Sequence, residues 1–264
     1  MGISTCPMCG CPIRIARRED GAADHYEYID EHERQHLPNP ISPVLADYLR
    51  AKRAGKKTIA MVGSDWSSGP WAPFGEIEVW GMNQLHGRPW FKTEDVSAWI
   101  QIHPKWIFTK DNPHNHWEWL KKEHPFPIYM QMVYDNVPSS KKYPLREIQQ
   151  KLINVDRGEL SVNKLFSSSF CFQIALALYK GYERIEIYGV SLLGEGEYAY
   201  QREALAYWIG KADGMGVEIW LPESCALLAE PLYGYEVIRH GETGEIVEDE
   251  SRIGSALPEM SIMQ

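Results

Sequence analysis

The sequence predicts a doubly wound α/β fold with a mostly parallel sheet and a small N-terminal zinc-binding appendage. Six short apolar segments recur between residues 58 and 222, and segments with a helical pattern lie between several of them. Near-continuous apolar strands are typical of a parallel sheet that is covered on both faces. Strands that alternate with helices form βαβ units with right-handed crossovers.

Each expected strand is short, rich in β-branched or aromatic residues, and without a regular alternation of polar residues. These strands are the segments 58–63, 78–83, 98–103, 126–131, 184–190 and 217–222. The expected helices begin near a capping residue and end near a glycine or proline. They are the segments 41–54, with Ser42 as N-cap, 112–123, with Asn112 as N-cap, 144–153, 168–180, which ends at Gly181, and 199–213.

Composition divides the chain into three parts. Residues 1–40 form an appendage and linker with three Cys, three His and few aliphatic residues. Residues 41–234 form the predicted nucleotide-binding domain, and residues 235–264 form an acidic hairpin or tail. The formal net charge of −9 gives the whole chain no attraction to nucleic-acid phosphates. A nucleic-acid partner would therefore need a local basic patch.

The sequence also bears on the compartment. The N-terminus lacks the apolar core of a signal peptide, and no apolar stretch approaches the length of a membrane span. Three Cys within residues 6–11 favour metal binding in a reducing compartment over a disulfide framework. We therefore expect a cytoplasmic protein without a membrane partner, and the oligomeric state is left open.

The N-terminal appendage carries a candidate zinc site. Cys6 and Cys9 form a C-x2-C pair, and His32 and His36 are spaced so that both imidazoles share one helical face. Two thiolates and two imidazoles make the tetrahedral set that Zn²⁺ prefers. A structural role is natural because a segment of this size buries little surface. Cys11 and His25 are rival ligands, and the alternative is that these Cys are ordinary reduced thiols.

Small polar residues follow the first two expected strands. Gly63, Ser64 and Asp65 begin a Gly-flanked loop after the first strand, where backbone N–H groups and hydroxyls can approach a phosphate. The loop matches neither the G-x-G-x-x-G nor the P-loop pattern, and an ordinary βα loop is the alternative. Asn83 ends the second strand, where its amide can bind a base edge or a ribose; the alternative is a turn Asn.

Further candidates lie toward the C-terminal half. Ser167, Ser168 and Ser169 precede an apolar helix, so their hydroxyls and the helix N–H groups form a candidate anion site, although one Ser serves as the cap. His103 ends the third strand at the expected ligand edge, and its alternative is a structural, hydrogen-bonded His. In the loop 193–202, Glu197 is a candidate general base, and Gln201 and Arg202 suit sugar or base recognition.

Four segments together resemble bacterial sialyltransferases that use CMP-sialic acid, and a wider Rossmann-like set that includes a pterin pyrophosphokinase group and uncharacterised phage proteins. They are VGSDWSSG, VWGMNQ, SSSFCFQIALALYKGYERIEIYGVSL and VEIWLPESCALL, within residues 58–228. The first loop departs from the family's Gly-Asn-Gly-Pro-Ser pattern. The resemblance implies a Rossmann-like fold and nucleotide contacts. The implied contacts are Gly63, Ser64, Asn83, Ser168 and Ser169, with Tyr188 and Tyr198 near the donor phosphate, where a phenol stabilises the leaving group.

We therefore predict a transferase-like enzyme that binds a nucleotide or nucleotide sugar, and the favoured reaction is either glycosyl transfer or nucleotidyl or pyrophosphoryl transfer. His103 or Glu197 would take the proton of a nucleic-acid or small-molecule acceptor. A divalent cation with the nucleotide is a further expected cofactor. One alternative is a non-catalytic module that binds or sequesters nucleotides. Another is a nucleic-acid-associated zinc protein that uses Arg14, Arg17 and Arg18 in the N-terminal segment.

Overall fold

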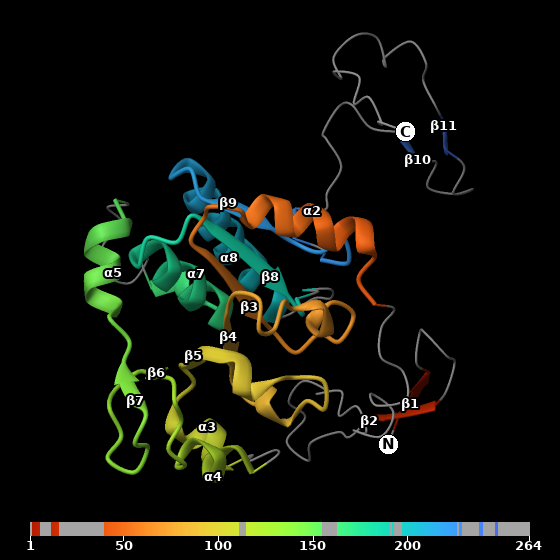
Figure 1. Cartoon of the computed structure of the whole chain (residues 1–264). Coiled ribbons are helices and arrows are strands. Elements are labelled where there is room, and N and C mark those ends of the chain that lie inside the picture. Colours follow the sequence, from red (N-terminus) through yellow and green to blue (C-terminus); the bar gives the residue numbers. More distant parts are fainter. Residues whose placement is uncertain are drawn as a thin grey trace.

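Figure 1 shows a computed structural model of the whole chain. The structure describes residues 2–5, 12–15, 40–110, 115–154, 163–190, 192, 197–225, 227–228, 238–239 and 246–247. Residues 40–228 contain the body of the fold, a single sheet with helices on both faces.

The central element is a seven-stranded sheet in which every pair of neighbours is parallel. Its order is β7-β6-β5-β4-β3-β8-β9. The strands are β3 (Thr58–Val62), β4 (Glu78–Met82), β5 (Val96–Gln101), β6 (Ile128–Met130), β7 (Ser140–Lys142), β8 (Arg184–Tyr188) and β9 (Glu218–Trp220). This confirms the predicted doubly wound parallel sheet.

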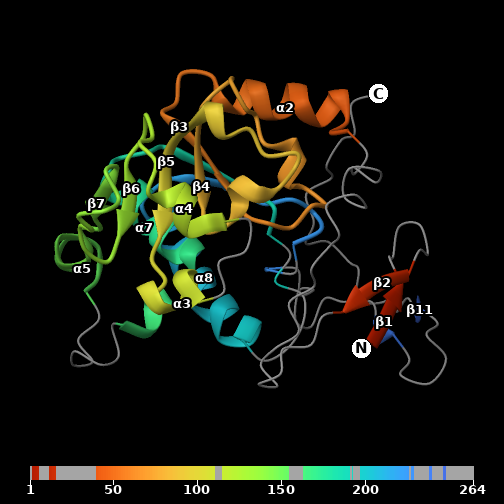
Figure 2. The same cartoon turned by 90° about the horizontal axis from the view of Figure 1, so that it is seen from below.

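The strand order reverses at the centre of the sheet. From β3 the chain adds β4, β5, β6 and β7 in one direction, and Figure 2 shows β4 to β7 side by side. It then returns to place β8 against the other side of β3, and β9 outside β8. In open α/β sheets, the crevice at the carboxyl ends of the two strands that flank such a reversal is where ligands bind.

The six predicted strands are all present, each within about two residues of its expected bounds. The edge strand β7 was not predicted. Its residues, Ser140, Lys141 and Lys142, are half-buried or exposed, so it lacks the apolar pattern that identified the other strands. Polar residues on an edge strand also protect the sheet against pairing with another chain.

Most helices follow the expected capping. In α2 (Pro43–Arg53), the Ser42 side chain accepts a hydrogen bond from the Leu45 N–H (3.2 Å). In α7 (Ser169–Tyr179), Ser168 is the N-cap, and Gly181 follows the helix with φ 73°. The helices α5 (Leu145–Leu152) and α8 (Glu197–Gly214) are close to their predicted ranges. The short α3 (Lys105–Lys110) was not predicted, and α4 (His116–Leu120) begins later than expected; Asn112 lies outside the described residues.

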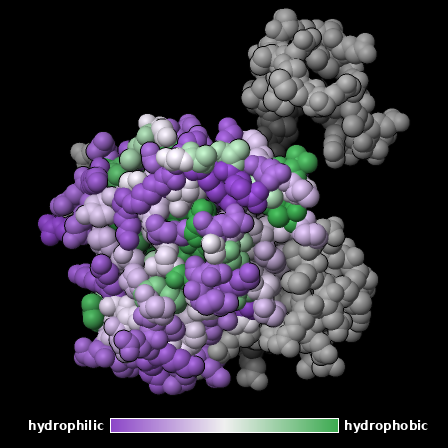
Figure 3. Space-filling model, in the orientation of Figure 1, coloured by the Kyte–Doolittle hydropathy of each residue, from purple (hydrophilic) through white to green (hydrophobic). Residues whose placement is uncertain are grey.

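Alternating residues of the central strands build two cores. On one face, Ile59 and Met61 of β3 pack with residues of α5, α7 and α8. On the other face, Ala60 and Val62 pack with an aromatic group around α3 and α4. The helix α2 lies alongside β8 and β9 (Figure 1). The face shown in Figure 3 is mainly hydrophilic, with apolar residues in small separate patches, as expected when the apolar strands are covered on both sides.

Two pairs of short strands lie outside this body. β1 (Gly2–Thr5) pairs antiparallel with β2 (Pro12–Ile15), and Thr5 is opposite Pro12. β10 (Ile238–Arg239) pairs antiparallel with β11 (Ile246–Val247). Within the described part of the chain, each helix is too short or too polar to cross a membrane.

Candidate functional site

The loops that follow β3 and β8 are hydrogen-bonded to each other at the point where the strand order reverses. The Gly63 N–H donates to the Tyr188 carbonyl (2.9 Å), and the Asp65 N–H donates to the Gly189 carbonyl (3.0 Å). A Cβ atom on Gly63 would lie 2.4 Å from the Gly189 carbonyl oxygen, and one on Gly189 would lie 2.3 Å from the Gly63 carbonyl oxygen. Gly189 also has φ +64°, which an L side chain rarely adopts. Both glycines are therefore required by the close approach of two backbones.

The β3 loop is further fixed by its own polar side chains. The Asp65 carboxylate accepts hydrogen bonds from the Ser67 N–H (2.8 Å) and from the Ser67 hydroxyl. The buried Ser68 hydroxyl accepts a hydrogen bond from the Gly189 N–H (3.0 Å). Ser224, in the segment after β9, lies with its hydroxyl 3.2 Å from that of Ser67. The exposed Ser64 stands in this otherwise restrained loop.

Asn83, directly after β4, connects this rim to the start of α7. It has φ 50°, in the left-handed region that Asn tolerates better than most residues. Its backbone is held by hydrogen bonds to Ile100 and Trp99, the latter from the indole Nε1–H to the Asn83 carbonyl (3.2 Å). Its side-chain amide donates to the Ser169 hydroxyl (3.3 Å). The structure thus brings together two predicted ligand-binding residues from different elements.

The N-terminus of α7 completes the rim. The Ser168 side chain accepts a hydrogen bond from the Cys171 N–H (3.4 Å), so this Ser is the cap, as expected. The ring of Phe170 lies against Gly63, since a Cβ there would be 2.7 Å from the ring. The α7 N-terminus therefore touches the β3 loop directly. Ser167 and Ser169 are half-buried beside it.

The arrangement has a definite chemical character. Ser64 and Ser169 offer hydroxyls, and Asn83 offers an amide donor and acceptor. The first turn of an eleven-residue helix points its N–H groups, and the positive end of its dipole, toward this rim. Such a set suits the phosphate and ribose of a nucleotide.

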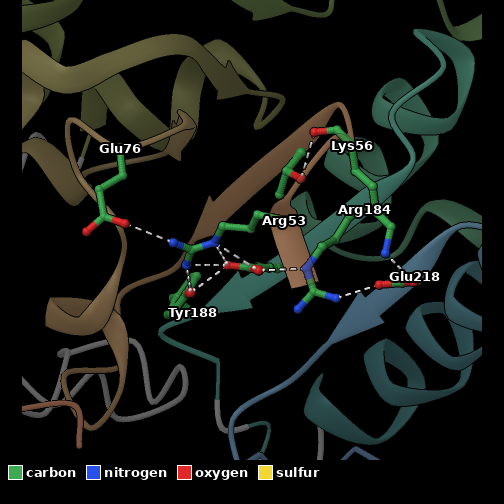
Figure 4. A network of polar contacts seen from close by, with 8 residues as sticks. Arg53, Lys56, Glu76, Arg184, Tyr188 and Glu218 are labelled. Atoms are coloured by element: carbon green, nitrogen blue, oxygen red, sulfur yellow. Dashed lines mark hydrogen bonds and ion pairs between the residues drawn. The ribbon is translucent and has the colours of Figure 1, made fainter. Parts of the chain in front are cut away.

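The backbone of Tyr188 lies at this rim, but its phenol does not, which corrects the prediction that the phenol stabilises a leaving group. Its side chain is 0% exposed and points toward the guanidinium of Arg53, the last residue of α2 (Figure 4). The hydroxyl donates to the Glu186 carboxylate (2.8 Å) and accepts from Arg53 (3.1 Å). Burial, followed by the neighbouring Glu186 charge, raises the pKa of the phenol far above its ordinary value.

Tyr188 belongs to a buried network of charged side chains (Figure 4). Glu186, which is 0% exposed, accepts hydrogen bonds from Arg53 (2.7 Å) and from Arg184 (2.8 Å). Arg184 also pairs with Glu218 (2.8 Å). A buried carboxylate needs such partners because its desolvation is expensive. The network fixes the C-terminal end of α2 to β8.

The other predicted residues have varied outcomes. His103 follows β5 at the carboxyl edge and is half-buried. Arg202 donates to the Leu192 carbonyl (2.8 Å), so it holds the segment after β8. Gln201 is half-buried on α8. Glu197 and Tyr198 begin α8, two residues earlier than expected, and their side chains lie outside the described part of the structure.

The expected metals are not tested by the structure. Cys6, Cys9, His32 and His36, with the rivals Cys11 and His25, lie outside the described residues. Among the side chains that are described, no group of three or more His, Cys, Asp or Glu is placed to hold a metal ion.

A second polar group at the carboxyl edge was missed by the sequence analysis. His86 Nε2 lies 3.0 Å from His116 Nδ1, and His116 Nε2 lies 2.9 Å from Gln101 Oε1. His86 belongs to the 3₁₀ turn η2 (Leu85–Gly87) after β4, Gln101 ends β5, and His116 begins α4. A signal was present in Gln101, a polar residue that ends an apolar strand, but its partners are 15 or more residues away.

Comparisons with known proteins give little beyond a remote likeness. No protein-family model matches the sequence, and no curated protein matches it. Among solved structures, the sialyltransferase CstII from Campylobacter jejuni in complex with cytidine-5'-monophosphate is 14% identical, with 74% of this chain and 96% of that chain covered and a TM-score of 0.43. The monofunctional alpha-2,3-sialyltransferase Cst-I from Campylobacter jejuni is 15% identical, with 76% and 91% covered and a TM-score of 0.43.

Both structures are sialyltransferases, the family that segments of the sequence resemble. A likeness at this level assigns no activity to the present chain. What the site can bind and do is therefore argued below from its own residues.

Proposed function

We propose that this protein binds a nucleotide or nucleotide sugar at the carboxyl edge of β3, β4 and β8, and that it is a transferase. The observation that carries the proposal is the convergence of the Gly63 loop, Asn83 and the α7 N-terminus beside the reversal in strand order. Such a reversal is the usual place for a ligand in an open α/β sheet.

Each part of a nucleotide has a suitable partner. A phosphate suits the first turn of α7, where Ser169 adds a hydroxyl to the helix N–H groups. The ribose or base suits the Asn83 amide, which can donate and accept at once. Gly63 lets the β3 loop pack closely against Gly189 and Phe170, and the next residue, Ser64, is exposed and can offer its hydroxyl to the ligand.

The transfer step needs a base for the acceptor hydroxyl. His103 fits this role by its position at the end of β5, beside β4. Glu197 and Tyr198 stay candidates for base and leaving-group stabilisation, since both begin α8 after the loop that follows β8. A divalent cation with the nucleotide is part of the same proposal. Tyr188 is not part of it because its phenol is buried elsewhere.

Titration calorimetry with CMP, UDP, GDP and dTDP, and with a nucleotide sugar of each, tests the proposal. We expect the nucleotide with one of these four bases to bind in the micromolar range. The sugar of the corresponding nucleotide sugar should then be transferred to an acceptor or released by hydrolysis. Binding without turnover would favour the alternative of a sequestering module. Absence of binding for every nucleotide would contradict the proposed function.

We also propose a structural Zn²⁺ held by Cys6 and Cys9 with His32 and His36. The pairing of Thr5 with Pro12 supports it, because this pair confines Cys6, Cys9 and Cys11 to one connection of six residues between β1 and β2. Closely spaced thiolates of this kind form half of many zinc sites. Elemental analysis of the purified protein should find one zinc per chain. Cys6→Ser should abolish it, whereas a metal-free wild-type protein prepared with zinc in the medium would contradict the proposal.

A further inference from the structure

Three large apolar side chains are exposed beside the carboxyl ends of β5 and β6. Trp106, on α3, is 66% exposed, and Met132 and Val133, in the segment after β6, are 54% and 59% exposed. Single exposed apolar residues are common on protein surfaces, whereas a group of them with polar surroundings marks a site of interaction. We call these three residues the apolar patch.

The two segments that carry the apolar patch lie side by side. β5 and β6 are parallel neighbours, so their carboxyl ends meet at one edge of the sheet. Beyond the strands, the Gln131 amide donates a hydrogen bond to the Ile102 carbonyl (2.8 Å). The rings of Phe108, on α3, and Tyr134, in the segment after β6, have centroids 6.4 Å apart. These contacts hold α3 against the segment after β6 and bring their exposed residues to one surface.

Basic side chains flank the apolar patch, although the whole chain has a formal net charge of −9. Residues 104–152 contain eight Lys or Arg and five Asp or Glu. Lys105 precedes Trp106 on α3, and its ammonium lies 5.2 Å from the centroid of the Trp117 ring. Lys142 is exposed on the edge strand β7, in register with Met130 at the end of β6. The apolar patch therefore lies in a positively charged part of an acidic chain.

The acidic side chains near the apolar patch leave most of this positive charge in place. Glu118, on α4, is paired with Lys121 (2.6 Å), and Asp135 is an exposed carboxylate two residues after Val133. The negative charge elsewhere in the chain repels an anionic surface. The face with the apolar patch is therefore the one that such a surface favours.

The size and composition of the apolar patch decide among its partners. A stable protein interface buries about 800 Å² on each partner, whereas an aromatic side chain contributes only about 150–250 Å². Three partly exposed side chains supply too little area for such an interface. Single-stranded nucleic acid stacks successive bases on aromatic rings, and Trp106 is the one aromatic residue of the patch. A lipid surface requires neither a matching shape nor several rings.

We propose that the apolar patch is a docking surface for an anionic phospholipid membrane. The Trp106 indole and the side chains of Met132 and Val133 enter the boundary between headgroups and acyl chains, a region in which Trp is enriched. Lys105 and Lys142 lie beside the lipid phosphates, which attract basic side chains. This attachment to one leaflet requires no membrane-spanning helix, and it does not depend on the proposed nucleotide site.

Flotation of the full chain with lipid vesicles tests the proposal. We expect binding to vesicles of phosphatidylcholine mixed with phosphatidylglycerol, and about tenfold weaker binding to phosphatidylcholine alone, because two lysines face the anionic headgroups. Raising the salt concentration from about 0.1 M to about 1 M, which shortens the Debye length from about 10 Å to about 3 Å, should weaken binding to the mixed vesicles.

Substitutions in the apolar patch should weaken docking without unfolding the protein. Trp106→Ser, and the double variant Met132→Ser with Val133→Ser, should each bind the mixed vesicles about tenfold more weakly than the wild type, because they remove apolar surface that the lipid covers. Lys142→Glu should reduce the preference for phosphatidylglycerol. Urea unfolding should be unchanged in each variant because the substituted side chains are exposed.

Matched controls lie on the exposed face of α2. Val44→Ser removes an apolar side chain that is 81% exposed, and Lys52→Glu reverses an exposed charge. Both variants should bind the mixed vesicles as the wild type does. A loss of binding in Val44→Ser equal to that in Trp106→Ser would overturn the assignment of docking to the apolar patch.

Fluorescence shows directly whether Trp106 enters the lipid. Lipids with brominated acyl chains quench an indole that lies among them, so docking should quench the fluorescence of the wild type. Trp106→Phe keeps an apolar ring, so it should still bind the vesicles but lose most of this quenching.

Three results would overturn the proposal: no binding to the mixed vesicles, equal binding by Trp106→Ser and the wild type, or unchanged quenching in Trp106→Phe. A dimer or an oligonucleotide complex that Trp106→Ser disrupts would assign the apolar patch to a second copy or to nucleic acid instead. None of these results bears on the nucleotide site, because the calorimetry with nucleotides is carried out without lipid.

Discussion

The side-chain amide of Asn83 lies 3.3 Å from the hydroxyl of Ser169, although 86 residues separate them in the chain. One residue follows β4 and the other begins α7, so their contact joins two elements that contribute different groups to the rim. Amide and hydroxyl are then held in one place before any ligand arrives, which lowers the entropic cost of binding.

Asn83→Ala and Ser169→Ala should each weaken nucleotide binding about five- to tenfold, the usual worth of one neutral hydrogen bond. Calorimetry on both single variants and the double variant measures their coupling. Because the two side chains contact each other, the loss of binding free energy in the double variant should be smaller than the sum of the losses in the two single variants.

Two controls match these changes. Ser97→Ala removes a half-buried hydroxyl from the amino-terminal half of β5, and Asn154→Ala removes an exposed amide after α5. Both should bind the nucleotide as the wild type does. An equal loss of nucleotide affinity in Ser97→Ala and Ser169→Ala would show that the weaker binding does not arise at the rim.

The glycines at the strand-order reversal should tolerate no side chain. Gly63→Ala and Gly189→Ala each force a Cβ to within 2.4 Å of a backbone oxygen, and such overpacking costs about 1–3 kcal/mol or more. Urea unfolding should show this loss. Gly210→Ala is the control, because its Cβ would meet nothing within 4 Å and alanine favours a helix by about 1 kcal/mol. A stable Gly63→Ala protein would contradict the close approach of the two loops.

Tyr188→Phe tests whether Tyr188 is structural. The change removes the hydrogen bonds of the phenol with Glu186 (2.8 Å) and Arg53 (3.1 Å), so the free energy of unfolding should fall by about 1–3 kcal/mol. Turnover per folded molecule should not change. A loss of turnover without a loss of stability would restore the catalytic role that the sequence suggested.

Glu186→Leu should be much more damaging than Tyr188→Phe. It leaves the guanidinium groups of Arg53 and Arg184 without their shared carboxylate, and breaking a buried ion pair costs about 3–5 kcal/mol. Urea unfolding again measures the loss. Glu123→Gln, at an exposed position, serves as the control. A loss below about 1 kcal/mol would mean that Glu186 is not buried among these charges.

Stability should depend on pH through Glu218. The hydrogen bonds from Lys56 and Arg184 lower the pKa of this carboxyl in the folded state. Its contribution is therefore present above the ordinary carboxyl pKa of about 4.3, and it is lost as the pH falls through the lowered value. Glu218 is partly exposed, so its ion pairs add at most about 1 kcal/mol to the free energy of unfolding. Glu218→Gln should be less stable than the wild type at about pH 6 and equally stable at about pH 2; an unchanged difference would contradict the pairing.

The sequence alone predicted the elements whose residues are uniformly apolar. The strand β3, with five buried residues, was found with its carboxyl end at the correct place. The cap Ser42 was predicted because capping is local, and the cap of α7 was predicted to be one of three serines, of which the structure selects Ser168. The polar edge strand β7 was not predicted, since nothing within its three residues distinguishes it from a loop.

Side-chain partners across the sheet could not be predicted in the same way. The resemblance to sialyltransferases implied that Tyr188 lies near the donor phosphate, but its phenol contacts Arg53, which precedes it by 135 residues. The hydrogen-bonded histidines are 30 residues apart, and neither lies in a recognisable motif. Such contacts follow from the strand order, which single-sequence patterns do not specify.

A crystal structure with the nucleotide identified by calorimetry tests the central claim most directly. We predict that the phosphate lies at the first turn of α7, with Ser169 in contact and the ribose or base against Asn83. A nucleotide at the amino-terminal edge of the sheet, or one that leaves Gly63, Asn83 and Ser169 untouched, would contradict the account.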